Sequence, residues 1–166
     1  MPIYMLDTDI SSYIMKRSDK IVLRQLQLVL VRDICISAIT ESELMYEVEI
    51  SPRQQQGRAA LDAFLKHVEA LDYPDQAAPH YGQISAALKL AGNLIDANDL
   101  LIAARARCLG FSPVTNNTRA FSWAKGPLSR ELDKTGSVIS IGRRAQSWLL
   151  IRKQPVQSWT AGLLTR

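Results

Sequence analysis

Three carboxylates in this sequence stand where they could hold a metal ion together. Asp7 closes a short apolar run, Glu43 follows a second apolar run, and Asp99 opens a long apolar stretch. Carboxylate oxygens are the usual protein ligands of Mg²⁺. A bound cation can polarise a phosphodiester and generate hydroxide from water. The three acids are therefore candidates for a metal-assisted hydrolysis of phosphodiester bonds.

Each of these acids also has a purely structural interpretation. Asp7 could cap the helix that follows it, as Asp does routinely. Thr40 and Glu43 have the spacing of a capping box, in which Glu43 would bond back to the start of its helix. Asp96 is well placed as an N-cap, and Asp99 would then suit the helix dipole in the first turn. Taken singly, capping explains Asp7 and Glu43 better, while the two interpretations of Asp99 are balanced.

Other kinds of chemistry find little support in the sequence. His67 and His80 have no Cys or His at the spacing of a zinc site. The sequence contains neither a Gly-rich phosphate loop nor a Gly-x-Ser-x-Gly nucleophile motif. Glu47 shares a helix face with Glu43, so it is either a helper of the site or a solvated acid.

The elements that must position these acids alternate between short apolar runs and helical patterns. Strands are expected at residues 3–6, 34–37, 68–71, 112–115 and 137–141. Helices are expected at 22–30, from 41 onward, at 61–68, at 81–91 and at 100–109, the last ending at Gly110. Such alternation predicts a parallel sheet covered on both faces. Ligand chemistry gathers at the carboxyl ends of such strands, where Asp7 and the segment 115–117 fall.

The composition is typical of one compact globular domain. The chain has 166 residues, of which 47% are hydrophobic and 22% charged. Its most apolar stretch, 21–39, is interrupted by charges and cannot span a bilayer. The first ten residues carry acids and do not resemble a secretory signal. Cys35 and Cys108 are too few for a disulfide framework, so we expect two reduced, buried thiols in a cytoplasmic protein.

The charge is unevenly distributed along the chain. No acid follows Asp133, and the basic residues after it sum to +6. Because the net charge of the whole chain is +4, the preceding part carries −2. These basic residues are Lys134, Arg143, Arg144, Arg152, Lys153 and Arg166. Two interpretations remain open: a solvated, partly disordered tail, or an arm that contacts RNA weakly.

Four segments together resemble the VapC group of PIN-domain toxins. They are residues 5–10, 36–44, 98–104 and 114–119, and both their order and their spacing match over about residues 1–128. The resemblance implies a three-layer α/β/α PIN fold with a central, mostly parallel sheet. It implies an endoribonuclease that depends on Mg²⁺ or Mn²⁺ and cuts structured RNA such as tRNA. It also implies a homodimer and a cognate VapB-type antitoxin, with no membrane partner.

The resemblance assigns roles to particular residues of this chain. Asp7, Glu43 and Asp99 match the acidic positions of the family, as catalytic residues and as metal ligands. Asn117 matches a polar position beside the metal. Asp96 and Thr115 are further auxiliary candidates, although the family often has a small neutral residue where this chain has Asp96. For the three acids, this implication outweighs the capping interpretations.

The sequence departs from the family pattern at two places. Ala120 stands where the group usually carries a fourth acid, and losing a carboxylate should weaken a cation site. This leaves an alternative function open: a catalytically weakened or silent PIN module that binds antitoxin or RNA without cleavage. A nuclease acting on single-stranded DNA is also compatible with these residues. The second departure is an atypical basic C-terminal extension over residues 129–166, beyond the PIN domain expected at 1–128.

Overall fold

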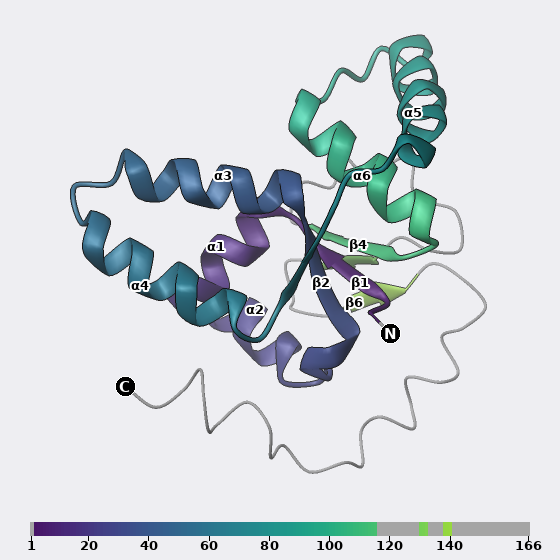
Figure 1. The fold of residues 1–166 in the computed structure, drawn as a ribbon. Helices are drawn as coiled ribbons and strands as arrows, with labels where there is room; N and C mark the ends of the chain where they lie inside the picture. The colour runs from purple at the N-terminus through teal and green to yellow at the C-terminus, as the bar shows by residue number, and fades with distance from the viewer. Residues whose placement is uncertain (1, 116–129, 133–137, 141–166) are drawn as a thin grey trace.

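The sheet at the centre of the molecule has six strands. A computed structural model of the chain describes residues 2–115, 130–132 and 138–140, and the sheet order is β3-β2-β1-β4-β5-β6 (Figure 1). The strands are β1 (Tyr4–Leu6), β2 (Ile34–Ser37), β3 (Glu69–Leu71), β4 (Ser112–Thr115), β5 (Arg130–Leu132) and β6 (Val138–Ser140). Neighbouring strands are parallel, except that β5 and β6 are antiparallel. The predicted mostly parallel sheet is confirmed.

The two central strands are buried on both faces, as expected of a parallel sheet between helical layers. Every residue of β1 and β2 is buried. In the register of these strands, Met5 pairs with Cys35 and Leu6 with Ile36. Successive side chains on a strand point to opposite faces, so each pair contributes to a different side of the core. This explains why both runs are continuously apolar and do not alternate with polar residues.

Helices cover both faces of the sheet and complete three layers. They are α1 (Thr8–Lys16), α2 (Lys20–Leu26), α3 (Ala38–Glu49), α4 (Gln54–Leu65), α5 (Ala78–Leu90) and α6 (Ala97–Leu109), with short 3₁₀ turns at Val31–Asp33 and Asp75–Ala77. Leu6 and Ile36 pack in one core cluster with residues of α1 to α4, whereas Met5 and Cys35 pack in another with α6. Figure 1 shows α1 to α4 on one side of the sheet and the α5–α6 pair on the other. The α/β/α architecture predicted from the sequence is confirmed.

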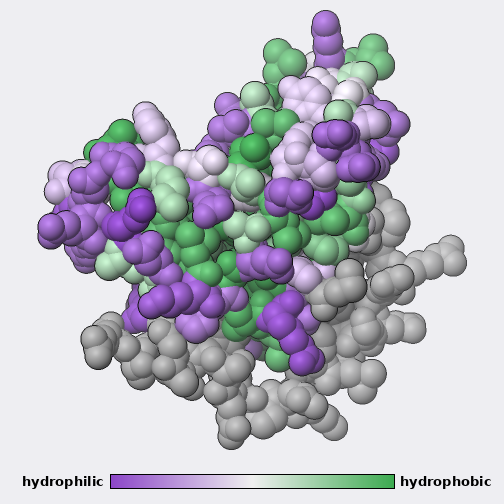
Figure 2. Space-filling view, viewed as in Figure 1, coloured by the Kyte–Doolittle hydropathy of each residue, from purple (hydrophilic) through white to green (hydrophobic). Residues whose placement is uncertain are grey.

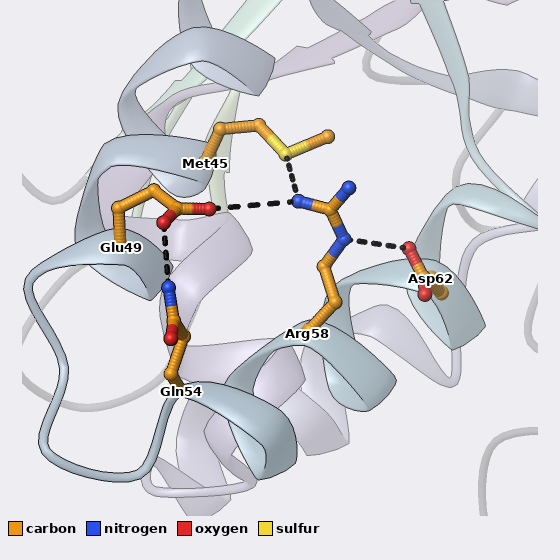
Figure 3. A network of polar contacts seen from close by, with 5 residues as sticks. All are labelled: Met45, Glu49, Gln54, Arg58 and Asp62. Carbon is orange, nitrogen blue, oxygen red and sulfur yellow. Dashed lines mark hydrogen bonds and ion pairs between the residues drawn. The ribbon is translucent and has the colours of Figure 1, made fainter.

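A polar network joins α3 to α4 on the outside of this layer (Figure 3). The Arg58 guanidinium lies 3.9 Å from Glu49, 3.6 Å from Asp62 and 3.4 Å from the sulfur of Met45. Gln54 donates to Glu49 at 2.5 Å. Because these charged side chains are about half exposed, the network adds little stability.

Some expected helix boundaries were wrong. Helix α3 begins at Ala38, not near residue 41, because Ser37 at the end of β2 is its N-cap and accepts a hydrogen bond from the Thr40 amide. Helix α2 ends at Leu26, so the expected continuation to residue 30 is absent, and Leu30 is exposed. Helix α6 ends as predicted, at Gly110 in the left-handed conformation with φ 67°.

Both cysteines are free thiols. Cys35 is fully buried, and burial raises the pKa of its thiol to about 12, so it is an unreactive core residue. Cys108 is also a free thiol, but it is partly exposed and not buried as expected.

In the described ranges, no helix has the length and apolarity needed to cross a membrane. The division of the chain at residue 128 stays a prediction.

Candidate active site

An acidic cleft of about 650 Å³ lies beside the carboxyl end of β1, between the starts of α1 and α6 and one face of α3. The side chains that line it are Asp7, Thr8, Asp9, Ile39, Ser42, Glu43, Tyr46, Glu47, Asn98 and Asp99. The surface is notched between the lobe of α3 and α4 and the lobe of α5 and α6 (Figure 2). The cleft therefore brings the three predicted acids together from segments far apart in the sequence.

Asp7 has both of the roles that the sequence suggested for it. Its carboxylate accepts a hydrogen bond from the Ile10 amide at 2.8 Å and so caps α1. The same carboxylate lines the cleft and accepts a hydrogen bond from the Thr115 side chain at the end of β4. Capping and a place in the cleft are compatible because one side chain at the β1–α1 junction faces both the helix start and the crevice.

The electrostatic state of Asp7 is unusual. Asp7 is only 3% exposed, and burial is the main cause that raises the pKa of its carboxyl to about 7. The hydrogen bonds from Thr115 and Ile10 oppose this rise, while the nearby negative charges of Asp9 and Asp99 add to it. Acids crowded into a buried site are costly to ionise without a compensating cation. A cation beside Asp7 would lower this cost of ionisation.

Glu43 does not form the capping box that its spacing suggested, because Ser37 caps α3 instead. Its carboxylate points across the cleft and is held by two donors from other elements. The Thr8 hydroxyl donates to Oε2, and the Asn98 amide nitrogen donates to Oε1 at 2.9 Å. Glu43 thus lines the cleft, and the capping interpretation is wrong for this residue.

The acids at the start of α6 have separate positions. Asp99 lines the cleft in the first turn of the helix and acts electrostatically on Asp7. Asp96 is the N-cap of α6, as predicted, and accepts from the Asn98 amide at 2.8 Å. It is exposed and is not among the residues that line the cleft. The candidate Asn117 and the departure at position 120 lie outside the described residues.

Sequence reasoning missed several polar contacts of the site. The roles of Thr8 and Asn98 as donors to Glu43 were not foreseen, although each is next to a predicted acid in the chain. Glu47 lines the cleft and accepts from Ser12 at 3.0 Å and from Lys16 at 2.8 Å, so it is not merely solvated. The spacing of four residues between Glu43 and Glu47 was the signal for this second acid.

The donor set fits a hard cation bound with few protein ligands. Among the described residues, no three His, Cys, Asp or Glu side chains are grouped closely enough to hold a metal ion jointly. Mg²⁺ in proteins commonly uses only one or two carboxylates and keeps several waters. Asp7 and Asp99 line one cleft, and the charge of Asp99 adds to the rise in the pKa of Asp7, so the two carboxylates could supply such a pair.

The fold and the cleft define a PIN domain, and the family model described as the PIN domain matches residues 4–126. Ribonuclease VapC2 of Haemophilus influenzae is 40% identical over 118 residues, which cover 71% of this chain and 89% of that protein. The tRNA(fMet)-specific endonuclease VapC of Shigella flexneri is 37% identical over 123 residues, covering 74% of this chain and 92% of that protein. The chain belongs to the PIN-domain family and, within it, to the VapC-type ribonucleases of toxin–antitoxin systems.

Solved structures agree with this assignment. DNA-bound VapBC from Salmonella typhimurium is similar with a TM-score of 0.67 and 36% identity, over 74% of this chain and 92% of that chain. VapBC2 from Rickettsia felis, bound to a DNA fragment from its promoter, has a TM-score of 0.66 and 34% identity, over 72% of this chain and 91% of that chain. These homologous structures are toxin–antitoxin complexes.

Proposed function

We propose that this chain is a toxin endoribonuclease that hydrolyses RNA phosphodiester bonds with the help of Mg²⁺ or Mn²⁺. The observation that supports this most directly is the joint placement of Asp7, Glu43 and Asp99 in one cleft. In the proposal, Asp7 and Asp99 bind the cation and Glu43 reaches it directly or through water. The cation, when bound, supplies Lewis-acid polarisation of the scissile phosphate.

The surrounding residues would prepare the site for this chemistry. The Ile10 amide and the Thr115 side chain orient the Asp7 carboxylate and favour its ionised form. Burial has the opposite effect, so the cation and the proton compete for Asp7 near neutral pH. Ile39 and Tyr46 add apolar surface to the wall of the cleft.

The proposed substrate class is structured RNA, with tRNA as the first candidate. A relative that is 37% identical carries the name of a tRNA(fMet)-specific endonuclease. The decisive experiment incubates the purified full chain with total tRNA in Mg²⁺ or in EDTA, beside an Asp7→Asn variant. Cleavage that needs both Mg²⁺ and Asp7 would support the proposal. The absence of cleavage, with RNA binding retained, would favour the alternative of a silent module.

Metal binding has its own test. We expect isothermal titration of Mn²⁺ to show a clear loss of affinity in Asp99→Asn, because one of the two direct carboxylates becomes a neutral amide. Equal affinity in the wild type and Asp99→Asn would contradict the assignment of Asp99.

We also propose a homodimer and a VapB-type antitoxin as partners. On α3, Tyr46 is 65% exposed and Ile50 is 63% exposed, and Tyr46 also lines the cleft. An antitoxin segment would cover this apolar surface and place an Arg among the acids, since a guanidinium pairs bidentately with carboxylates. Light scattering at micromolar concentration tests the dimer. A complex in which no basic side chain enters the cleft would contradict the antitoxin mode.

A further inference from the structure

Glu43 connects the two segments that carry the proposed metal ligands. Its Oε2 accepts from Thr8, the residue directly after Asp7, and its Oε1 accepts from Asn98 at 2.9 Å, the residue directly before Asp99. The two bonds join residues 35 and 55 positions apart in the sequence. Through Glu43, the first residue of α1 is therefore linked to the second residue of α6.

Both oxygens of Glu43 are thus occupied by donors from different helices. A carboxylate that accepts two such bonds is fixed in position and orientation, and hydrogen bonds to an ionised acceptor are stronger than neutral ones. Each oxygen still has acceptor capacity for a water molecule. Among the described residues, no three acids are close enough to bind one ion together. This spacing and the two bonds that hold Glu43 are the observations from which its place relative to the cation is inferred.

We propose that Thr8 and Asn98 are positioning residues that clamp Glu43 between the segments of Asp7 and Asp99, so that Glu43 acts on the cation only through water. The clamp has two consequences. It fixes how far apart Asp7 and Asp99 lie, and it orients one further carboxylate toward the waters of the cation. This inference rests on the proposed function, because it assumes that a divalent cation binds at Asp7 and Asp99.

The first test counts the waters on a bound ion. Water-proton relaxation of Mn²⁺ bound to the full chain depends on the number of waters that the ion itself holds. Glu43→Gln preserves the clamp, since the new carbonyl can accept from Asn98 and the new amide can donate to the Thr8 hydroxyl. We expect the relaxation enhancement per bound Mn²⁺ to be the same in the wild type, Glu43→Gln and Glu43→Ala. A rise in Glu43→Ala would show that a water has replaced a direct Glu43 ligand, and would overturn the inference.

The second test removes the donors and leaves the acids intact. Thr8→Val keeps the shape of the side chain without its hydroxyl, and Asn98→Ala removes the amide. We expect each to lower Mn²⁺ affinity about tenfold, the scale found when groups that orient metal ligands are lost. Thr8→Ser should restore affinity to near the wild-type value. Asn93→Ala is the matched control for Asn98→Ala, because Asn93 is an exposed residue of the same α5–α6 connection.

The outcomes separate this inference from the function on which it rests. If Asp7→Asn binds Mn²⁺ as tightly as the wild type, the proposed metal site fails and the clamp fails with it. If Asp7→Asn loses binding while Thr8→Val and Asn98→Ala retain wild-type affinity, only the clamp is overturned. Loss in both donor variants, recovery in Thr8→Ser and no change in Asn93→Ala would support it.

Discussion

Thr115 and Asp7 lie at the ends of neighbouring parallel strands, and the Thr115 side chain donates a hydrogen bond to the Asp7 carboxylate. This bond lowers the pKa of Asp7, against the burial that raises it to about 7. Thr115→Val keeps the shape but removes the donor, so the pKa of Asp7 should rise further. In the proposed function the ionised form of Asp7 binds the cation, so we expect the acidic limb of the pH–rate profile for RNA cleavage to move to higher pH. Thr115→Ser should move it back, and an unchanged profile in Thr115→Val would contradict this role.

The burial of Asp7 also predicts a stability effect in the metal-free protein. The pKa of Asp7 is raised from 3.8 to about 7 in the folded state, so the folded chain holds a proton in this range that the unfolded chain has released. Stability contributed by that proton is present at low pH and is lost as pH rises from about 4 to about 7.

Asp7→Asn cannot ionise, yet its side-chain oxygen can still cap α1. We therefore expect this variant to be more stable than the wild type at pH 8 in EDTA, with the advantage vanishing near pH 4. A shift of roughly three pKa units at about 1.4 kcal/mol each sets an upper limit of about 4 kcal/mol. Urea unfolding at the two pH values measures the difference. Equal stability of the two proteins at pH 8 would show that ionising Asp7 does not lower the free energy of unfolding.

A second charged contact tests stability away from the cleft. Arg105 is 6% exposed, and its guanidinium lies 2.9 Å from the carboxylate of Asp72, which is 82% exposed. Asp72→Ala would leave the buried cation without this acceptor. Hydrogen bonds to charged groups contribute about 1.5–3 kcal/mol, and the exposure of Asp72 reduces this to about 1 kcal/mol.

Asp72→Asn retains an acceptor oxygen and should lose less stability than Asp72→Ala. Chemical denaturation of both variants at neutral pH checks the order. If Asp72→Ala unfolds at the same denaturant concentration as the wild type, water solvates the Arg105 guanidinium as well as Asp72 does.

The layers of the fold were predictable from the sequence because the strands are short apolar runs and the helices end at clear signals. The strand at 34–37 and the end of α6 at Gly110 were found where expected. The start of α3 was not, because Ser37 and Thr40 are both good N-caps and only the end of β2 decides between them. Local propensity cannot choose between these two N-caps, because the choice depends on where β2 ends and long-range strand pairing sets that end.

The site shows the same division between local and long-range information. Strand ends in a parallel sheet meet at one edge, so Asp7 could be placed near other ligands from sequence patterns. The partners of Glu43 could not, because hydrophobic periodicity does not show which side chains meet across 35 or 55 residues. Glu43 had the spacing of a capping box, and only the packing of α1, α3 and α6 shows that its carboxylate faces the cleft.

The last prediction concerns Ala120, which lies outside the described residues. The resemblance to the VapC group implies a fourth acid at position 120, directly after the segment 114–119, so we expect Ala120→Glu to return a carboxylate to the proposed site. Added negative charge and an added oxygen ligand should tighten Mg²⁺ binding and raise tRNA cleavage at least about tenfold, the scale associated with groups around a metal site. If Ala120 merely belongs to a first helical turn, a new Glu would change stability by a few tenths of a kcal/mol and leave cleavage unchanged.

A side-by-side tRNA assay at fixed Mg²⁺ distinguishes the two cases. Equal rates would place the missing carboxylate elsewhere, and a rise that also requires Asp7 would show that the new acid acts in the same cleft.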